Sequence, residues 1–195
     1  TAAREIDRVL AAALQQKRPV YIELPRDMAN KPIATATHAD SWTVPFTPRA
    51  APEVLAAAVA EAVERINRAE RPVILADVEV QRFGLQGKLL RLVENGRIPV
   101  AATILSKSVV REDHPLYLGV YEGAMGRQEL TDYLEGSDCL IFLGVFMSDV
   151  NLGIFTAQHD PGRVINATGE RLSIGYHAYD GIGLGDFLPA LIAAQ

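Results

Sequence analysis

The sequence predicts an α/β protein in which a doubly wound, mainly parallel sheet of five or six strands carries helices on both faces. Short apolar runs alternate with longer segments of helical periodicity along most of the chain. A helix end, Arg-Pro-Val and a strand occur together at 17–24 (KRPVYIEL) and at 70–77 (ERPVILAD), with a related RIPVAATIL at 97–105. The apolar runs hold few polar residues, which is typical of strands buried on both faces of a parallel sheet.

The main series of elements begins with a predicted helix over 52–66. Pro52 suits its first position, where the missing N–H costs nothing. Glu61 and Arg65 are expected to pair one turn apart on the solvent side. The helix is predicted because its apolar residues form one stripe, made of Leu55, Val59, Ala62, Val63 and Ile66.

The rest of the series continues the same alternation. After the strand in 70–77, a helix is predicted over 85–93, with Asn95-Gly96 in a C-cap role. The run 97–105 is the next strand, and a further strand is expected just before the glycines of 119–126. The remaining elements are a helix through 130–134, strands at 139–144 (CLIFLG) and 163–168 (RVINAT), a weaker extended stretch near 174–179, and a closing helix after Asp186.

The first fifty residues differ from this series. Residues 1–27 are predicted to be the terminal helix and strand of a preceding domain, because the strand at 20–24 has no earlier sheet to join. Residues 28–51 are interpreted as an interdomain linker, since they are rich in proline, lack periodicity and far exceed the usual connection of about 4–6 residues. Residues 52–195 form the predicted α/β domain. A start without Met, inside an amphipathic pattern, is expected of a piece of a larger protein.

Composition excludes several classes of partner. The formal net charge is −5 and the pI is about 5.4, so binding to nucleic acid is not expected. Cys139 is the single cysteine, which excludes an internal disulfide framework and fits a reducing compartment. No apolar run approaches the roughly 20 residues that a membrane-spanning helix needs. We therefore expect a soluble, cytoplasmic protein with no membrane partner.

The turn after the strand in 70–77 is the natural place for a dinucleotide, but it lacks the glycines that let a pyrophosphate touch bare backbone. Gly84 comes late, and Asp77 places a negative charge where phosphate would sit. The stretch GLQGKLL (84–90) is interpreted as a helix start rather than a phosphate-binding loop. GVYEGAMG (119–126) is interpreted as a turn-forming loop rather than a phosphate cradle.

Other candidate groups have similarly plain interpretations. In MSDVNLG (147–153), Asp149 and Asn151 are assigned to turn and cap duty, because further oxygen ligands for a metal are not evident. The four histidines lack the paired spacing of zinc sites. Cys139 lies in an apolar strand and is interpreted as a small core residue. The residues alone therefore predict no catalytic, cofactor-binding or metal site.

With these segments defined, nearly the whole chain resembles thiamine-diphosphate-dependent enzymes, from the end of the pyrimidine-binding domain through the Rossmann-like central domain. The stretches RFGLQ (82–86), GVYEGAMGR (119–127) and FMSDVNLGIFTA (146–157) are most similar to 2-oxo acid decarboxylases of the indolepyruvate/phenylpyruvate type. The resemblance implies a parent enzyme that uses thiamine diphosphate and Mg²⁺ to convert an aromatic or branched 2-oxo acid to an aldehyde and CO₂, with the cofactor acting as electron sink.

The resemblance also implies which domains of the enzyme carry the reactive groups. The activating glutamate and the Gly-Asp-Gly…Asn-Asn signature of the family lie in the pyrimidine-binding and diphosphate-binding domains, so no catalytic residue is carried over to this chain. The chain alone is expected to be inactive, to bind no cofactor, and to act mainly as architecture in a homo-oligomer, a dimer of dimers.

Two further hypotheses stay open at the level of sequence. The first is that the central domain binds FAD or ADP, as in relatives similar to acetolactate synthase or to oxidases. The second gives the crevice at the carboxyl ends of the strands a regulatory role. Its candidate lining consists of Asp77, Lys107, Tyr121 and Asp149.

Overall fold

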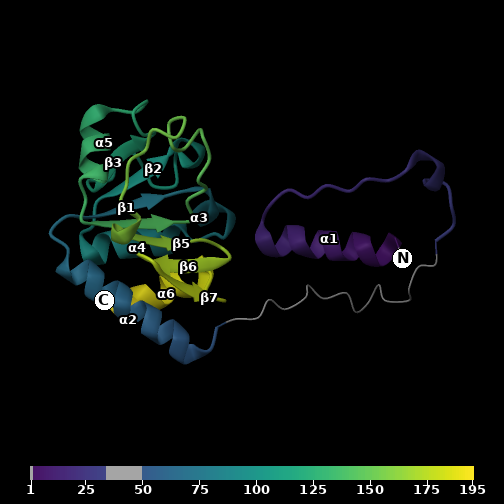
Figure 1. Ribbon diagram of the computed structural model, residues 1–195, viewed down its shortest axis with the longest axis horizontal. Helices are drawn as coiled ribbons and strands as arrows, with labels where there is room; N and C mark the ends of the chain where they lie inside the picture. The colour runs from purple at the N-terminus through teal and green to yellow at the C-terminus, as the bar shows by residue number, and fades with distance from the viewer. Residues whose placement is uncertain (1, 34–49) are drawn as a thin grey trace. The chain divides into compact units, whose positions relative to one another are not determined.

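The computed structural model describes residues 2–33 and 50–195, and the chain divides into two compact units, Thr1–Pro48 and Arg49–Gln195 (Figure 1). The predicted linker over 28–51 lies mostly outside the described residues. Each unit is described by itself below.

The first unit holds helix α1, Ala2–Gln16, and a short 3-10 helix, Arg26–Met28. In α1 the side chain of Ala11 is buried, whereas Ile6, Leu10 and Leu14 remain 37–48% exposed. Residues 20–24, predicted as a strand, do not form one. A strand needs a neighbour for its backbone hydrogen bonds, and the described residues of this unit provide no such neighbour.

The second unit has the predicted alternation of helices and strands. It begins with α2, Pro52–Arg68, and ends with α6, Leu184–Ala193. Between them lie β1 (Pro72–Ala76), α3 (Val78–Arg82), α4 (Gln86–Gly96), β2 (Val100–Thr103), the 3-10 turn Ile104–Ser106, β3 (Tyr117–Tyr121), α5 (Gln128–Glu135), β4 (Cys139–Leu143), the 3-10 turn Pro161–Arg163, β5 (Val164–Ala167), β6 (Arg171–Ile174) and β7 (His177–Asp180).

The strands form one seven-stranded sheet in the order β3-β2-β1-β4-β5-β6-β7. Strands β1 to β5 are parallel, while β6 pairs antiparallel with β5 and β7 antiparallel with β6. The predicted α/β class is thus confirmed, but the predicted number of five or six strands is too low. The weak stretch near 174–179 proved to be part of a hairpin, whose turn is made by Gly175 in a left-handed conformation and Tyr176.

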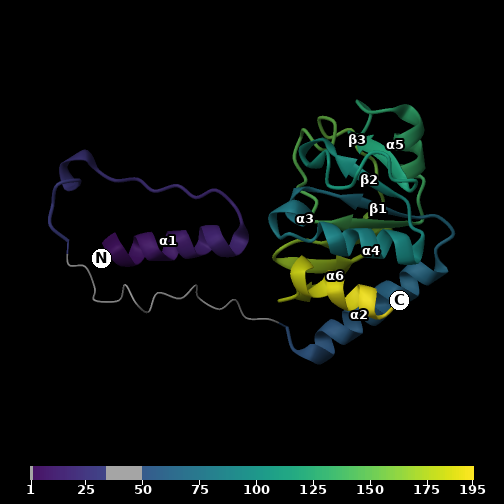
Figure 2. The ribbon, with the colours of Figure 1, turned by 180° about the vertical axis from the view of Figure 1, so that it is seen from behind.

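Helices cover both faces of this sheet. In β1, Ile74 and Ala76 join the core cluster formed with α2, α4 and α6, whereas Val73 and Leu75 join the cluster on the opposite face with α5. This alternation is what a strand buried on both sides requires. Figure 2 shows α4 and α6 in front of the sheet, and Figure 1 shows α5 beside β3.

The end of α4 differs from the predicted C-cap by one residue. Gly96 is the last helical residue, and Arg97 takes the left-handed conformation, with a φ of 49°. The surroundings of Gly96 are closely packed, since a Cβ there would lie 2.9 Å from Cδ1 of Ile98, at the flexible end of that side chain.

Candidate functional site

The topology marks one place on the sheet where a ligand would be expected. Strand β1 pairs with β2 on one side and with β4 on the other, so the strand order reverses between β1 and β4. Ligands of doubly wound sheets bind outside the carboxyl ends of the strands at this switch point. In this chain the residues at that position are Asp77, directly after β1, and Gly144, directly after β4.

The carboxylate of Asp77 is the centre of the switch point. Asp77 is fully buried. Its Oδ1 accepts a hydrogen bond from Oγ1 of Thr103, at the end of β2. Its Oδ2 accepts from the backbone N–H of Phe146 at 2.7 Å and from Nδ2 of Asn151 at 2.7 Å. The side chain therefore ties the ends of β1 and β2 to the loop that follows β4.

The partners of Asp77 are fixed by further hydrogen bonds. Asn151 also donates from Nδ2 to the carbonyl oxygen of Phe146, at 2.8 Å. Ser106 receives the backbone N–H of Thr103 on its Oγ and donates to the carbonyl oxygen of Ala76 at 2.9 Å. These polar groups are buried and mutually satisfied, which gives a rigid network rather than an open binding site.

A second acidic side chain fills the neighbouring part of the switch point. Glu79, in α3, is only 4% exposed, and its Oε2 accepts the backbone N–H of Gly169 at 2.7 Å. Gly144 has a φ of 66°, and a Cβ there would lie 2.6 Å from Cβ of Glu79. The start of α3 and the turn after β4 therefore pack directly against each other. Two carboxylates occupy the place where a nucleotide phosphate would need donors.

The structure places the four predicted crevice residues separately. Asp77 is buried in the network just described. Lys107 is exposed and lies 3.7 Å from a carboxylate oxygen of Glu112. Asp149 is exposed, and its Oδ1 accepts the backbone N–H of Val150 at 2.8 Å. Asn151, to which the sequence analysis assigned turn and cap duty, is the side chain of this loop that reaches Asp77.

Tyr121, the fourth predicted residue, belongs to a different cluster. It is 3% exposed, and its hydroxyl donates to Oε1 of Glu135 at 2.7 Å. Burial, together with the Glu135 carboxylate, raises the pKa of Tyr121 well above its usual value. Oε1 of Glu135 also accepts the backbone N–H of Gln158 at 3.0 Å. Tyr121 therefore connects β3 to α5 rather than lining the switch point.

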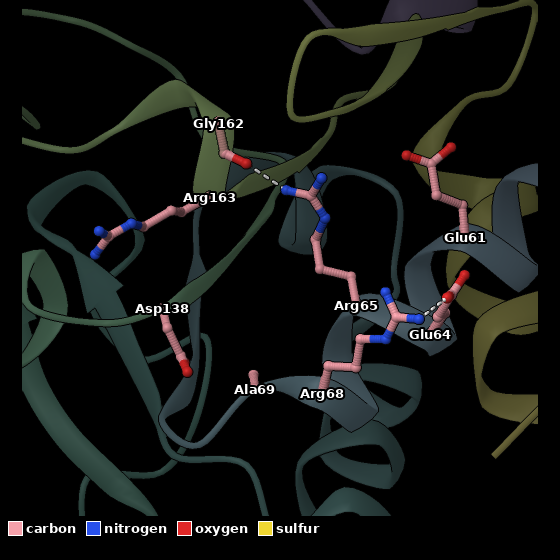
Figure 3. Close-up of a pocket in the computed structure, with 8 residues that line it drawn as sticks. All are labelled: Glu61, Glu64, Arg65, Arg68, Ala69, Asp138, Gly162 and Arg163. Carbon is pink, nitrogen blue, oxygen red and sulfur yellow. Dashed lines mark hydrogen bonds and ion pairs between the residues drawn. The ribbon is translucent and has the colours of Figure 1, made fainter.

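A cavity of about 340 Å³ lies at the amino-terminal edge of the sheet (Figure 3). Arg65 of α2 points to the carbonyl oxygen of Gly162 and donates a hydrogen bond to it. Arg68 pairs with Glu64 at 2.6 Å. The cavity is lined by Glu61, Glu64, Arg65, Arg68, Ala69, Asp138, Gly162 and Arg163.

The charged side chains that line this cavity form hydrogen bonds and ion pairs with other groups of the protein. Both carboxylate oxygens of Asp138 accept backbone N–H groups, from Glu70 at 2.7 Å and from Arg71 at 2.9 Å. These bonds, that of Glu70 foremost, lower the pKa of Asp138. The cavity also lies away from the carboxyl ends of the strands, where such sheets bind ligands. We interpret it as a polar brace between α2 and the turns before β4 and β5.

Glu61 and Arg65, which were expected to pair, form their hydrogen bonds with other groups. The Oε2 of Glu61 accepts from the hydroxyl of Tyr179 at 2.6 Å and lies 3.0 Å from Nδ1 of His177, both on β7. Partial burial alone would raise the pKa of Glu61, but the bonds from Tyr179 and His177 outweigh it and the pKa lies below its usual value. Burial and Glu61 raise the pKa of Tyr179 to about 12.

Other candidate chemistry is equally limited in the part of the chain that the structure describes. Residues 2–33 and 50–195 contain no group of three or more His, Cys, Asp or Glu side chains that could hold a metal ion. Cys139 is fully buried, as predicted for a core residue, and burial raises the pKa of its thiol to about 11. Within the same ranges no helix has the length and apolar character needed to span a membrane.

The fold and the filled switch point define a class of protein, a doubly wound α/β domain whose ligand crevice is occupied by its own side chains. Residues 59–186 match the family described as thiamine pyrophosphate enzyme, central domain. The chain belongs to this family.

Several similar curated proteins are decarboxylases of 2-oxo acids. The chain is 34% identical over 191 residues to an indole-3-pyruvate decarboxylase of Azospirillum brasilense, covering 98% of this chain and 34% of that protein. It is 28% identical over 193 residues to pyruvate decarboxylase isozyme 2 of Saccharomyces cerevisiae, covering 99% and 34%. An alpha-keto-acid decarboxylase of Mycobacterium leprae is 31% identical over 192 residues, covering 98% and 33%.

These matches confirm the resemblance to thiamine-diphosphate-dependent 2-oxo acid decarboxylases that the motifs predicted. The chain spans about a third of the length of the curated relatives it matches.

Replacing Asp77 with alanine should strongly destabilise the second unit. The substitution Asp77→Ala removes the acceptor of three hydrogen bonds, which are donated by the hydroxyl of Thr103, the backbone N–H of Phe146 and Nδ2 of Asn151. We expect the free energy of unfolding to fall by about 3 kcal/mol or more. The measurement is urea denaturation, with unfolding monitored by circular dichroism. Asp149→Ala, on the same loop but exposed, is the control and should change it by less than about 0.5 kcal/mol. Equal effects of the two substitutions would contradict the role assigned to Asp77.

Replacing Glu61 with glutamine should alter the acid dependence of stability. Because the pKa of Glu61 is lowered in the folded protein, its carboxylate stabilises the fold above the usual carboxyl pKa of 4.5, and this contribution is lost as the pH falls below that value. Tyr179 and His177 face it from β7, and Arg65 from α2.

We therefore expect Glu61→Gln to lower the free energy of unfolding by about 1 kcal/mol at pH 7, with the difference from the wild type shrinking below pH 4.5. Glu64→Gln, which removes the exposed partner of Arg68, is the control and should have little effect at either pH. A difference that stays constant from pH 7 to pH 3 would refute the role of the carboxylate.

Proposed function

We propose that this chain is the central, mainly structural domain of a thiamine-diphosphate- and Mg²⁺-dependent decarboxylase. The parent would convert an aromatic or branched 2-oxo acid, of the indolepyruvate or phenylpyruvate type, to an aldehyde and CO₂. The family match and the similarity to an indole-3-pyruvate decarboxylase over 98% of this chain support this proposal.

The main observation in favour of a structural role is that side chains of the chain itself fill the switch point. Asp77 and Glu79 occupy the place where a bound nucleotide would put its phosphates, and the loop after β4 is held down on Asp77 by Phe146 and Asn151. The described residues also offer no cluster for Mg²⁺. The filled switch point does not fit a nucleotide phosphate, and we derive no chemical step from this chain.

The reactive groups of the parent would then belong to its pyrimidine-binding and diphosphate-binding domains, which this domain would connect. We further propose that the parent is a cytoplasmic homo-oligomer, a dimer of dimers, in which the central domain helps subunits to associate. Thiamine diphosphate, when bound by the other domains, supplies the electron sink for decarboxylation.

The alternative is a central domain that binds FAD or ADP, as part of an enzyme similar to acetolactate synthase or to a thiamine-dependent oxidase. The two buried carboxylates at the switch point favour the structural role over this alternative, because a phosphate group there would face negative charge and would have to displace satisfied hydrogen bonds.

The proposal is tested with two proteins, the 195-residue chain and the full-length enzyme that contains it. With thiamine diphosphate and Mg²⁺ present, the full-length enzyme should release CO₂ from phenylpyruvate or indolepyruvate, whereas the 195-residue chain should release none. Fluorescence titration with FAD and calorimetry with ADP should detect no tight binding to either protein. Turnover by the chain alone, or stoichiometric FAD or ADP in the purified enzyme, would overturn the structural role.

The regulatory role of Asp77, Lys107, Tyr121 and Asp149 remains a separate prediction. The placement of these residues requires that any ligand reach the exposed Lys107 and Asp149 rather than the two buried side chains. Calorimetric titration of the chain with phenylpyruvate should give heats of binding that Lys107→Ala reduces. Flat heats at millimolar ligand would remove the hypothesis.

A further inference from the structure

The exposed apolar side chains of the second unit are concentrated at the carboxyl edge of the sheet. Of the ten large hydrophobic residues that are exposed in the described part of this unit, eight lie on three loops there, and the other two are Val54 and Tyr176. We call the most prominent of the eight the carboxyl-edge patch, defined as Leu105, Met125, Phe146, Val150, Ile154 and Phe155. They are 46–69% exposed.

Hydrogen bonds join the three loops that carry the patch. The backbone N–H of Leu105 donates to Oδ1 of Asn151 at 3.4 Å, which connects the loop after β2 to the loop after β4. The backbone N–H of Ala124 donates to Oγ1 of Thr156 at 2.9 Å, which connects the loop after β3 to the same segment. These bonds hold the three loops that carry the patch to one another.

The loop after β4 holds two of these side chains outward in an unusual backbone conformation. Ile154 and Phe155 have φ values of 56° and 60°, in the left-handed region that a β-branched or bulky residue rarely enters. They are 68% and 69% exposed. The backbone N–H of Ile154 is fixed by the carbonyl oxygen of Asp149 at 2.7 Å. Folding of this unit alone gains little from such an arrangement, whereas a covering partner would use it.

The chemistry of the patch indicates a dry, permanent contact. Segment 144–157 contains a single charged residue, Asp149. Obligate interfaces are apolar in this way, whereas transient ones keep a polar surface, and an apolar patch of this kind left in water promotes aggregation. The curated relatives extend well beyond the match, since the chain spans only 34% of the indole-3-pyruvate decarboxylase. A parent of similar length, as proposed above, would supply a covering partner within one polypeptide.

We propose that the carboxyl-edge patch is the surface on which a cofactor-binding domain of the same enzyme docks. This inference rests on the proposed function, because it takes its partner from there. The occupant is a domain of the enzyme rather than a second copy of this chain. The internal network around Asp77 keeps the docking loops in place before contact, so that docking orders few groups and loses little conformational entropy.

The test measures the accessibility of the patch by thiol labelling. Cys139 is buried, so an introduced cysteine reports its own exposure. Phe155→Cys and Met125→Cys probe two loops of the patch, and Tyr176→Cys, in the β6–β7 turn and 84% exposed, is the matched control. Each is labelled with a maleimide in the 195-residue chain and in the full-length enzyme, and the modified peptide is quantified by mass spectrometry.

In the 195-residue chain all three cysteines should react at similar rates. In the full-length enzyme the cysteines at 155 and 125 should react slower by on the order of tenfold or more, while the control at 176 is unchanged, because labelling follows the population of the open state. Equal rates in the two proteins would overturn the proposal. Protection that appears in the 195-residue chain as its concentration rises would overturn it in favour of a second copy.

Two further measurements separate a failure of the docking surface from an effect of the substitutions and from a failure of the proposed function. Hydroxyl-radical oxidation of the native Met125 and Phe155 probes the same surface without substitutions and should show the same protection in the full-length enzyme. CO₂ release from phenylpyruvate is assayed in parallel. Protection without decarboxylation would refute the proposed function and leave the docking surface standing, whereas decarboxylation without protection would refute the docking surface alone.

Discussion

The structure of the carboxyl edge depends on one buried carboxylate. The carboxyl group of Asp77 is fully buried, where a polar group without hydrogen-bond partners would be very costly. This cost is offset by three donors, one from Thr103 at the end of β2 and two, from Phe146 and Asn151, on the loop after β4. Because all of these donors must converge on one side chain, the ends of β1 and β2 and the loop after β4 have a single compatible arrangement.

The two edges of the sheet are therefore stabilised in different ways. At the carboxyl edge, buried hydrogen bonds to Asp77 and Glu79 close the switch point. At the amino-terminal edge and along β7, partly exposed charges of α2 hold the helix against the later strands, with Arg65 on Gly162 and Glu61 on Tyr179. The buried network resists rearrangement, while the contact of Glu61 with Tyr179 is expected to weaken when the carboxyl group of Glu61 is protonated. Both edges of the sheet are held by charged and hydrogen-bonding side chains of the kind that could otherwise bind a ligand.

Much of the fold could be predicted because its signals are local. Strands β1 and β4 are continuous apolar runs, and α2 has a regular apolar stripe, so burial on both faces of a sheet follows from periodicity. The β6–β7 hairpin was predicted only as a weak extended stretch, because buried residues alternate with exposed or half-buried ones in β6 and only Tyr179 is buried in β7. The extended run at 20–24 looked like a strand, but strand formation depends on a partner that periodicity does not reveal.

The switch point shows the limit of sequence reasoning more sharply. Asp77 was identified because it follows an apolar strand, but its partner Asn151 lies 74 residues away. Within MSDVNLG, Asp149 and Asn151 have the same kind of side chain and equivalent turn propensities. Only the fold decides that Asn151 is buried and Asp149 exposed. The hydrogen bond of Tyr121 to Glu135 is likewise a tertiary contact, which the sequence alone does not reveal.

The closed switch point and the carboxyl-edge patch are consequences of the same segment. A nucleotide site between β1 and β4 would require free backbone N–H groups there and would not tolerate the carboxyl group of Asp77. Removing that side chain would release Phe146 and Asn151, and with them the support of the loop that presents Ile154 and Phe155. On this sheet, holding a nucleotide and presenting the patch therefore exclude each other. A central domain that connects other domains gains from closing its crevice, because the hydrogen bonds that a ligand would have taken hold the docking loops instead.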